Sequence, residues 1–336
     1  MLRTRTLAIA GLYQFVLLLA ALALALGAAL AQPGTSYVTY QQQNRNFSDA
    51  DLWVGGVVPA TGASVTIVNS TVTMDVDVSL GTLTLSSGSL SLGTQTLTIT
   101  DQFINNSLNG VTPGTSTVIF NSTVADNNSG QVTVGGTEDV TFYNVAIPAG
   151  SVVDFDSGGT NNTETYITNQ LKMDGGSVVV NPAIYGGAST LLYDDTHTSI
   201  GTEWTAGASS GKGVPHHVSI GASSSLDFGS TSDNYTCTGD FTVDGASASL
   251  DVADITGTLT VDGDLSLGTS NAVSLMLPSV DGASKIVVGG DLTLGANTTI
   301  TGDKANLEVL GNLANSVTGV SFGLLKMKGS ADQDVT

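Results

Sequence analysis

One short phrase recurs four times between residues 235 and 315, and this repeat restricts the possible folds more than any other feature of the chain. Each copy has an alternating apolar and polar run, then Gly-Asp or Gly-Asn, then a second run. The copies occupy residues 235–243, 259–267, 286–294 and 307–315, so the repeat steps are 24, 27 and 21 residues. A period of this length, built from two-residue alternation, indicates a solenoid made of strands.

Stacked coils place equivalent residues above one another in parallel strands about 4.7–4.9 Å apart. Two apolar columns are therefore expected to point inward. One contains Cys237, Val261, Val288 and Val309, and the other contains Phe241, Leu265, Leu292 and Leu313. No coil buries its apolar edge alone, so the array is stable only as a stack. We predict an all-β fold, a parallel β-helix or β-solenoid with imperfect coils of 21–27 residues, and we expect it to be right-handed because parallel strands connect in that sense.

The composition favours strands and turns and excludes several functions. Only 11% of the residues are charged, and Gly, Thr, Ser, Asn and β-branched residues are abundant, as in strands and turns. The 29 acidic residues outnumber the 9 basic ones, so the surface repels nucleic acid and anionic polysaccharides. The single cysteine, Cys237, excludes an intrachain disulfide. Its place in a column of valines indicates an inert core thiol.

The first 31 residues have the order of a secretory signal peptide. Arg3 and Arg5 precede an apolar run over 7–30, and Ala29-Leu30-Ala31 forms a small-x-small cleavage site. An uncleaved anchor is the alternative, since the run is long enough to span a bilayer. Cleavage predicts a secreted, cell-surface protein with a net charge of −22, because Arg3 and Arg5 are lost from a chain of net charge −20. Membrane contact is then expected only through this segment or through an anchor beyond Thr336.

The rest of the chain divides into two imperfect copies of one unit. We expect a polar leader or amino-terminal cap over 32–50, a first β-helix module over 51–150, connecting coils over 151–202 and a second module over 203–336. Each module opens with Trp, followed by glycines, Pro and a Val-x-Ile strand. Residues 324–336 parallel 118–134, but no counterpart of 140–147 follows. We therefore expect the second module to be truncated and the sequence to be a fragment of a longer polypeptide.

Two stretches resemble a known group of proteins. One runs from Thr190-Leu-Leu-Tyr193 through Glu203-Trp204 and Gly213-Val214-Pro215 to Gly239-Asp240-Phe241, and the other from Val118-Ile119-Phe120 to Phe142-Tyr143-Asn144. Both look like repeat units of large secreted bacterial surface proteins with adhesin-like or autotransporter-passenger-like β-helix repeats, including type IX-secreted repeat proteins. The resemblance implies cell-surface display and cell adhesion. It also implies a carboxyl-terminal sorting domain, and no such domain is visible in this sequence.

The acidic residues of the repeat form the first candidate site. Asp240, Asp264 and Asp291 are expected to stack at one corner, with Asn312 continuing the column. A ladder of carboxylates could coordinate Ca²⁺, which prefers six to eight oxygen ligands. The alternative is that Asp and Asn suit the turn after Gly and face water. The repeat lacks the nonapeptide of calcium β-rolls, so we predict no cofactor and keep calcium as the alternative.

Tryptophans and paired carboxylates form the second candidate site. Trp53 and Trp204 open the two modules, and either could stack on a sugar or cover a turn. Asp194 and Asp195 could in principle supply the acid and base of a glycoside hydrolase, although neighbours on a strand point to opposite faces. Trp204, Asp194 and Asp195 are therefore the possible ligand contacts. The same alternation makes the adjacent His216 and His217 a poor metal site.

These features lead to one functional hypothesis and two alternatives. The leading hypothesis is a non-enzymatic exported structural or adhesive β-helix protein, whose acidic Thr/Ser-rich surface meets cell-surface or matrix glycans or proteins. The first alternative is a carbohydrate-active or carbohydrate-binding protein with a polysaccharide hydrolase-like groove at Trp204. A lyase is disfavoured, because only Arg45 and six lysines remain after residue 31. The second alternative is self-association into a filament through an open coil end.

Overall fold

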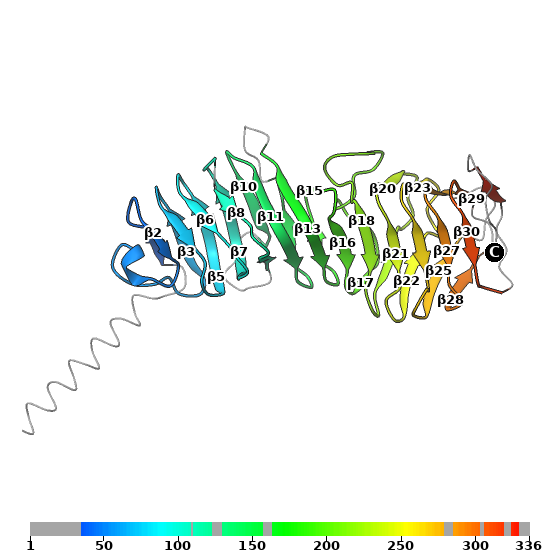
Figure 1. The fold of residues 1–336 in the computed structure, drawn as a ribbon, viewed down its shortest axis with the longest axis horizontal. Coiled ribbons are helices and arrows are strands. Elements are labelled where there is room, and N and C mark those ends of the chain that lie inside the picture. Colours follow the sequence, from blue (N-terminus) through cyan, green and yellow to red (C-terminus); the bar gives the residue numbers. More distant parts are fainter. Residues whose placement is uncertain are drawn as a thin grey trace, which may run out of the picture.

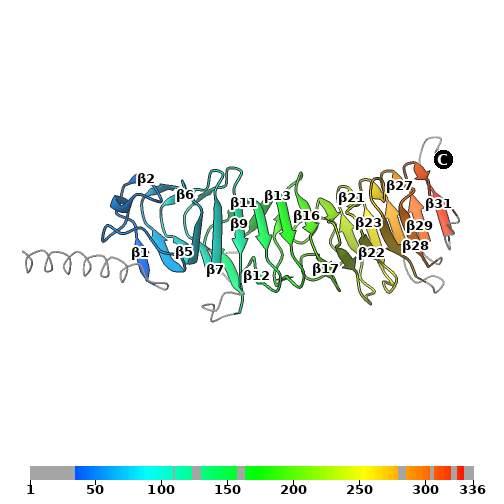
Figure 2. The same cartoon turned by 90° about the horizontal axis from the view of Figure 1, so that it is seen from below.

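The chain folds into an elongated parallel β-solenoid of about 11 turns, with 48% of residues in strands and a coil spacing of about 24 residues. The computed structural model describes residues 35–108, 110–122, 130–156, 163–278, 285–302, 306–318 and 324–328. Figures 1 and 2 show the strands stacked along one long axis, from the blue amino-terminal coils to the red carboxyl-terminal ones. The predicted all-β fold and solenoid architecture are confirmed.

One sheet runs along the whole solenoid. Its 17 strands are β1 (Ser36–Val38), β3 (Ala63–Ile67), β5 (Val78–Leu85), β7 (Thr96–Asn105), β9 (Thr117–Phe120), β10 (Val132–Gly136), β11 (Val140–Ile147), β12 (Val152–Asp154), β13 (Thr165–Met173), β14 (Val178–Val179), β15 (Ile184–Tyr185), β16 (Thr190–Tyr193), β18 (His217–Ile220), β21 (Phe241–Val243), β24 (Leu265–Leu267), β27 (Leu292–Leu294) and β30 (Leu313–Asn315). The strands pair in parallel, as a stack of coils requires.

Three smaller sheets close the sides of the coils. At the amino-terminal end the side sheet contains β2 (Asn44–Asn46), β4 (Thr71–Thr73), β6 (Ser89–Ser91) and β8 (Val111–Thr112). At the carboxyl-terminal end one side sheet contains β17 (Thr196–His197), β19 (Ser225–Asp227), β22 (Ala248–Asp251), β25 (Val273–Met276) and β28 (Thr298–Thr301). The other contains β20 (Tyr235–Cys237), β23 (Thr258–Val261), β26 (Lys285–Val288), β29 (Asn306–Val309) and β31 (Leu324–Met327). A short 3-10 helix, η1 (Ala50–Leu52), lies between the first two coils.

The repeat found in the sequence determines the register of the carboxyl-terminal coils. Phe241 pairs with Leu265, Leu265 with Leu292, and Leu292 with Leu313. The Cys237, Val261, Val288 and Val309 column pairs in the same way on the neighbouring sheet. All eight residues are buried. The predicted inward columns and their spacing are therefore confirmed, because alternation along each strand sends every second side chain to the interior.

The interior is one continuous apolar core. In the first half of the solenoid four rings, Phe103, Phe120, Phe142 and Phe155, contact one another edge to face, with centroids 5.2–5.9 Å apart. This T-shaped geometry is the one that aromatic quadrupoles prefer.

The segment expected to be a leader or cap over 32–50 already contains strands. β1 pairs with β3 and β2 pairs with β4, so the described residues from 35 onward form the first coil. The long sheet also continues through β13, β14, β15 and β16, which lie within the range expected to be connecting coils. The remaining module boundaries stay predictions. The signal segment 1–31 and residues 329–336 lie outside the described residues. Within the described ranges, no helix combines the length and apolar character required to cross a membrane.

Candidate functional site

The aspartates of the repeat form a hydrogen-bonded ladder at one corner of the solenoid. Oδ1 of Asp240 accepts a hydrogen bond of 2.9 Å from the backbone N–H of Asp264. Oδ1 of Asp264 accepts one of 2.7 Å from Asp291, and Oδ1 of Asp291 one of 2.7 Å from Asn312. The ladder begins at His217, whose Nδ1 accepts a bond of 3.0 Å from the N–H of Asp240. The predicted stack of turn acids is therefore confirmed.

The glycine before each aspartate makes room for this ladder. A Cβ atom at Gly263 would lie 2.4 Å from Oδ1 of Asp240, and one at Gly290 would lie 2.2 Å from Oδ1 of Asp264. Real Cβ atoms do not approach other atoms so closely, so the aspartate of one coil occupies the space above the glycine of the next. The Gly-Asp phrase therefore fixes the register between successive coils.

This arrangement favours the turn interpretation of the aspartates over the calcium one. One oxygen of each carboxylate is used by the N–H group of the following coil. Within the part of the chain that the structure describes, no group of three or more His, Cys, Asp or Glu side chains is placed to hold a metal ion. The calcium site at Asp240, Asp264 and Asp291 remains a prediction without geometric support.

Trp204 lies inside the solenoid as part of a buried polar network. Its Nε1–H donates to the hydroxyl of Tyr193 at 2.7 Å, and this hydroxyl donates to Oε1 of Glu203 at 2.9 Å. The same carboxylate oxygen accepts a bond of 2.9 Å from the N–H of Gly201. Only 3% of Trp204 is exposed. The indole has no free face for a sugar, so the structure does not support Trp204 as a ligand contact.

Burial also keeps the two tyrosine hydroxyls beside Glu203 protonated. It raises the pKa of the Tyr193 hydroxyl well above its ordinary value, and the negative charge of Glu203 raises it further. Tyr185, whose hydroxyl donates to the backbone oxygen of Glu203 at 3.2 Å, has its pKa raised by the same two causes. Both hydroxyls therefore remain protonated donors at neutral pH. The network stabilises the segment between β17 and β18, which contains no repeat phrase.

Trp53 is buried in the same manner at the start of the solenoid. Its Nε1–H donates to the backbone oxygen of Phe47 at 2.9 Å, and its ring packs edge-on against the Phe47 ring. It is fully buried. Of the two interpretations of the tryptophans, the packing one fits the geometry of both residues.

Asp194 and Asp195 directly follow β16 on the outer side of the solenoid, and the two carboxylates bind different partners. Asp194 accepts a bond of 2.7 Å from Nζ of Lys172, and this contact is the main cause of the raised pKa of Lys172. Oδ1 of Asp195 accepts a bond of 2.7 Å from the N–H of Thr196. Because Tyr193 points into the core, the next residue along the strand points outward. The structure therefore does not bring Asp194 and Trp204 into a common groove.

His216 and His217 both take part in the corner structure. Their rings contact each other with centroids 4.3 Å apart, so they do not point in opposite directions as expected for two strand residues. The reason is that β18 begins only at His217. Burial is the main cause of the lowered pKa of His216, and its Nδ1 lies 3.1 Å from Oγ1 of Thr238.

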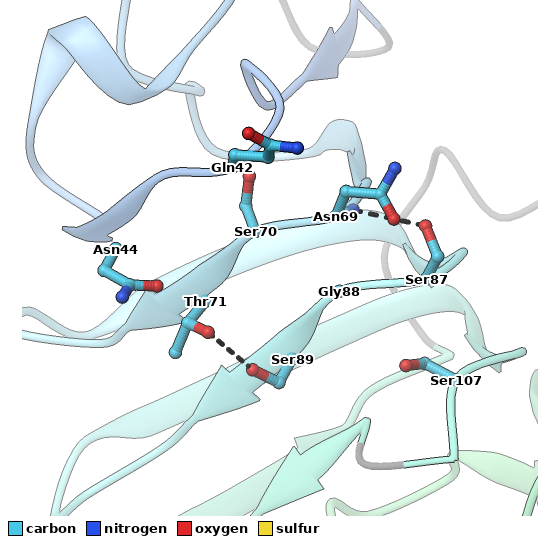
Figure 3. A pocket seen from close by; sticks show the side chains of 9 residues that line it. All are labelled: Gln42, Asn44, Asn69, Ser70, Thr71, Ser87, Gly88, Ser89 and Ser107. Atoms are coloured by element: carbon cyan, nitrogen blue, oxygen red, sulfur yellow. Dashed lines mark hydrogen bonds between the residues drawn. The ribbon is translucent and has the colours of Figure 1, made fainter.

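A polar cleft at the amino-terminal side sheet is a site that the sequence interpretation missed. It has a volume of about 600 Å³ and is lined by Gln42, Asn44, Asn69, Ser70, Thr71, Ser87, Gly88, Ser89 and Ser107. Figure 3 shows these residues on successive coils, and none of them carries a charge. The signal in the sequence is the run of outward polar pairs over 44–46, 71–73 and 89–91. Their alternation predicted strands but did not show that the surface is hollowed.

Some polar groups of the cleft are paired, and others are not. The N–H of Asn69 donates to Oγ of Ser87 at 3.2 Å, and the hydroxyl of Ser89 donates to Oγ1 of Thr71 at 3.1 Å (Figure 3). In contrast, the side-chain amides of Gln42, Asn44 and Asn69 make no hydrogen bond with the described residues. The cleft therefore offers donors and acceptors that water or a ligand can use.

No protein-family model, curated protein or solved structure matches this chain.

Proposed function

We propose that this chain is a non-enzymatic exported structural or adhesive protein that presents a long polar surface to other molecules. The observation that carries the proposal is a column of small polar side chains on the outer face of four neighbouring strands of the long sheet. Ser219, Thr242, Ser266 and Thr293 follow one another in register on β18, β21, β24 and β27. Such a column of small polar side chains on a rigid stack suits extended surface contact more than the enclosed geometry of an active site.

The charge and the amino-terminal segment also support this role. A net charge of −20 keeps an elongated surface protein soluble and limits binding to nucleic acid and anionic membranes. The signal-like order of residues 1–31 supports export. The resemblance to adhesin-like and type IX-secreted repeat proteins supports cell-surface display. The partners proposed on this basis are cell-surface or matrix glycans or proteins, together with further copies of the chain.

A carbohydrate-binding role is the second candidate, and the polar cleft favours it. The side-chain amides of Gln42, Asn44 and Asn69, which make no hydrogen bond with the described residues, are suited to sugar hydroxyls. Catalysis gains no support at the expected place, because Asp194 forms an ion pair with Lys172 and the N–H of Thr196 occupies one oxygen of Asp195. Hydrolysis requires two carboxyl groups on either side of one bond, and these two carboxylates are not arranged in that way.

The experiment that tests the proposal measures adhesion and catalysis together. Beads coated with purified chain are added to cells and to matrix polymers, and release of reducing sugar is followed in the same samples. Binding without release is the expected result. Sugar release would overturn the non-enzymatic role, and beads that bind neither cells nor matrix would overturn the adhesive one. Light scattering on the uncoated chain reports self-association.

A further inference from the structure

We propose that the polar cleft formed by β2, β4 and β6 binds a neutral oligosaccharide. The inference rests on the proposed adhesive function and deepens it, because it names the place and the chemical class of the ligand. It also moves the carbohydrate site away from Trp204, which is buried near the middle of the solenoid, to the amino-terminal coils.

The chemistry of the lining selects an uncharged, hydroxyl-rich ligand. Each amide side chain has two N–H donors and one acceptor oxygen, and each hydroxyl both donates and accepts. Sugar hydroxyls have the same dual character. None of the described residues that line the cleft is a cation, and the whole chain carries a charge of −20. An anionic glycan would therefore meet no counter-charge and an unfavourable field.

The backbone holds the amides at the rim of the cleft. Gln42 has φ of 61° and Asn69 has φ of 48°, both in the left-handed region that few residues other than glycine adopt. The two residues are stacked, since the N–H of Gln42 donates to the backbone oxygen of Asn69 at 2.8 Å. Glycine would be the least strained choice at both positions. Two amide side chains occupy them instead, and neither amide makes a hydrogen bond with the described residues.

Gly88 lines the cleft at the next coil. Gly88 lies one coil after Ser70, and a Cβ atom there would lie 2.5 Å from the backbone oxygen of Ser70 and 2.6 Å from Cγ2 of Ile67. Only glycine fits this position, because a side chain there would run into the preceding coil and the buried Ile67, so the segment with Ser87 and Ser89 packs closely against the coil that contains Ser70. Figure 3 shows the amides of Gln42 and Asn69 and the hydroxyls of Ser87 and Ser107 around the position of Gly88.

The size of the cleft fits an oligosaccharide. Its volume of about 600 Å³ lies within the range of roughly 300–1,000 Å³ that small-molecule sites occupy. Equivalent polar groups recur with the coil spacing of about 4.7–4.9 Å, so a chain of sugar rings can meet a similar group at each coil. The described lining of the cleft contains no aromatic ring. Binding is therefore expected to rest on hydrogen bonds and to be weak.

The test uses ligand-observed NMR, which detects weak binding, with the full chain and cello-, manno- and xylo-oligosaccharides as probes. A sulfated polysaccharide serves as the charged comparison. The cleft variants are Asn69→Gly, which suits the left-handed backbone, and the double variant Asn44→Ala with Asn69→Gly. The matched controls are Ser223→Gly and Asn297→Ala. Ser223 is an exposed residue with φ of 57°, and Asn297 is an exposed amide; neither lines the cleft.

The expected result is that at least one neutral probe binds the unmodified chain and both controls. The double variant should bind it about fivefold to tenfold more weakly, because two hydrogen-bonding side chains are lost. Matching thermal unfolding curves show that the variants are folded. Equal binding by every variant would overturn the cleft as the site while leaving the adhesive function intact. Binding of the sulfated probe alone, or of no probe, would overturn the ligand class, whereas the bead assay judges adhesion separately.

Discussion

Oδ1 of Asp264 lies 2.7 Å from the backbone nitrogen of Asp291, the residue that occupies the same corner one coil later. The carboxylate therefore satisfies a main-chain donor that no strand pairing uses. Asp240 serves Asp264 in the same way. These hydrogen bonds between neighbouring coils explain why the repeat phrase contains an acidic or amide residue directly after glycine. That residue holds one coil on the next.

The first prediction separates the acceptor oxygen of Asp264 from its charge. Asp264→Ala removes the acceptor and should lower the free energy of unfolding by about 1 kcal/mol. Asp264→Asn keeps an acceptor oxygen and removes one of the three stacked charges, which repel each other. The Asn variant should therefore be at least as stable as the unmodified chain at low salt, with a difference that shrinks as salt is added. Urea unfolding at two salt concentrations measures both. An equal loss in the two variants would contradict the role of the acceptor.

The second prediction concerns the glycine beneath that carboxylate. In Gly290→Ala the new Cβ would lie 2.2 Å from Oδ1 of Asp264 and 2.8 Å from the backbone of Gly263. Crowding of this kind should cost about 1–3 kcal/mol. Adding Asp264→Ala removes the nearer contact, so the double variant should lose less than the sum of the two single losses. Gly187→Ala is the control, because nothing lies within 4 Å of a Cβ there. Strict additivity would show that the carboxylate and the glycine are not coupled.

The register of the coils was accessible from the sequence because it depends on local information. Alternation places Val261 and Val288 in the core, and the repeat step places one above the other. The position of Trp204 depends instead on Tyr193, eleven residues away across a segment without a repeat. The cleft depends on the left-handed backbone at Asn69 and on the close approach at Gly88. Neither property appears in a pattern of apolar and polar residues.

The third prediction tests the buried network around Tyr193. Tyr193→Phe leaves the Nε1–H of Trp204 without its acceptor and removes one donor to Glu203. Each buried group that loses its partner costs about 1–3 kcal/mol, so the expected loss of unfolding free energy is about 2–4 kcal/mol. Tyr143→Phe is the matched control, since the half-buried Tyr143 hydroxyl bonds to none of the described residues, and its effect should stay within about 0.5 kcal/mol. Similar small changes in both variants would show that the network contributes little to stability.

The fourth prediction is a pH dependence at the last described coils. Hydrogen bonds from Lys328 and Lys285 lower the pKa of Glu308 from its ordinary value of 4.5, with N–O distances of 2.6 and 3.0 Å. A carboxyl group with a lowered pKa in the folded state stabilises the fold above its ordinary pKa, and this stabilisation is lost as the pH falls through the lowered value. The stability difference between the unmodified chain and Glu308→Gln should therefore be present at about pH 7 and shrink toward about pH 3. A difference that stays constant across this range would contradict the ion pairs.

The last prediction uses Cys237 as a reporter of coil opening. Burial raises the pKa of its thiol from 9.0 to about 12, and its Sγ lies 3.0 Å from the backbone oxygen of His216. The thiolate is the reactive form, so at about pH 8 the folded chain should react with iodoacetamide far more slowly than the urea-unfolded chain. Mass spectrometry gives a single signal, because the chain has one cysteine. Cys237→Val is the control. It should fold normally, since valine occupies the same column at 261, 288 and 309, and it should take no label. Fast labelling of the folded chain would show that the coil containing β20 opens readily, and that the column at Cys237 is less tightly closed than its burial indicates.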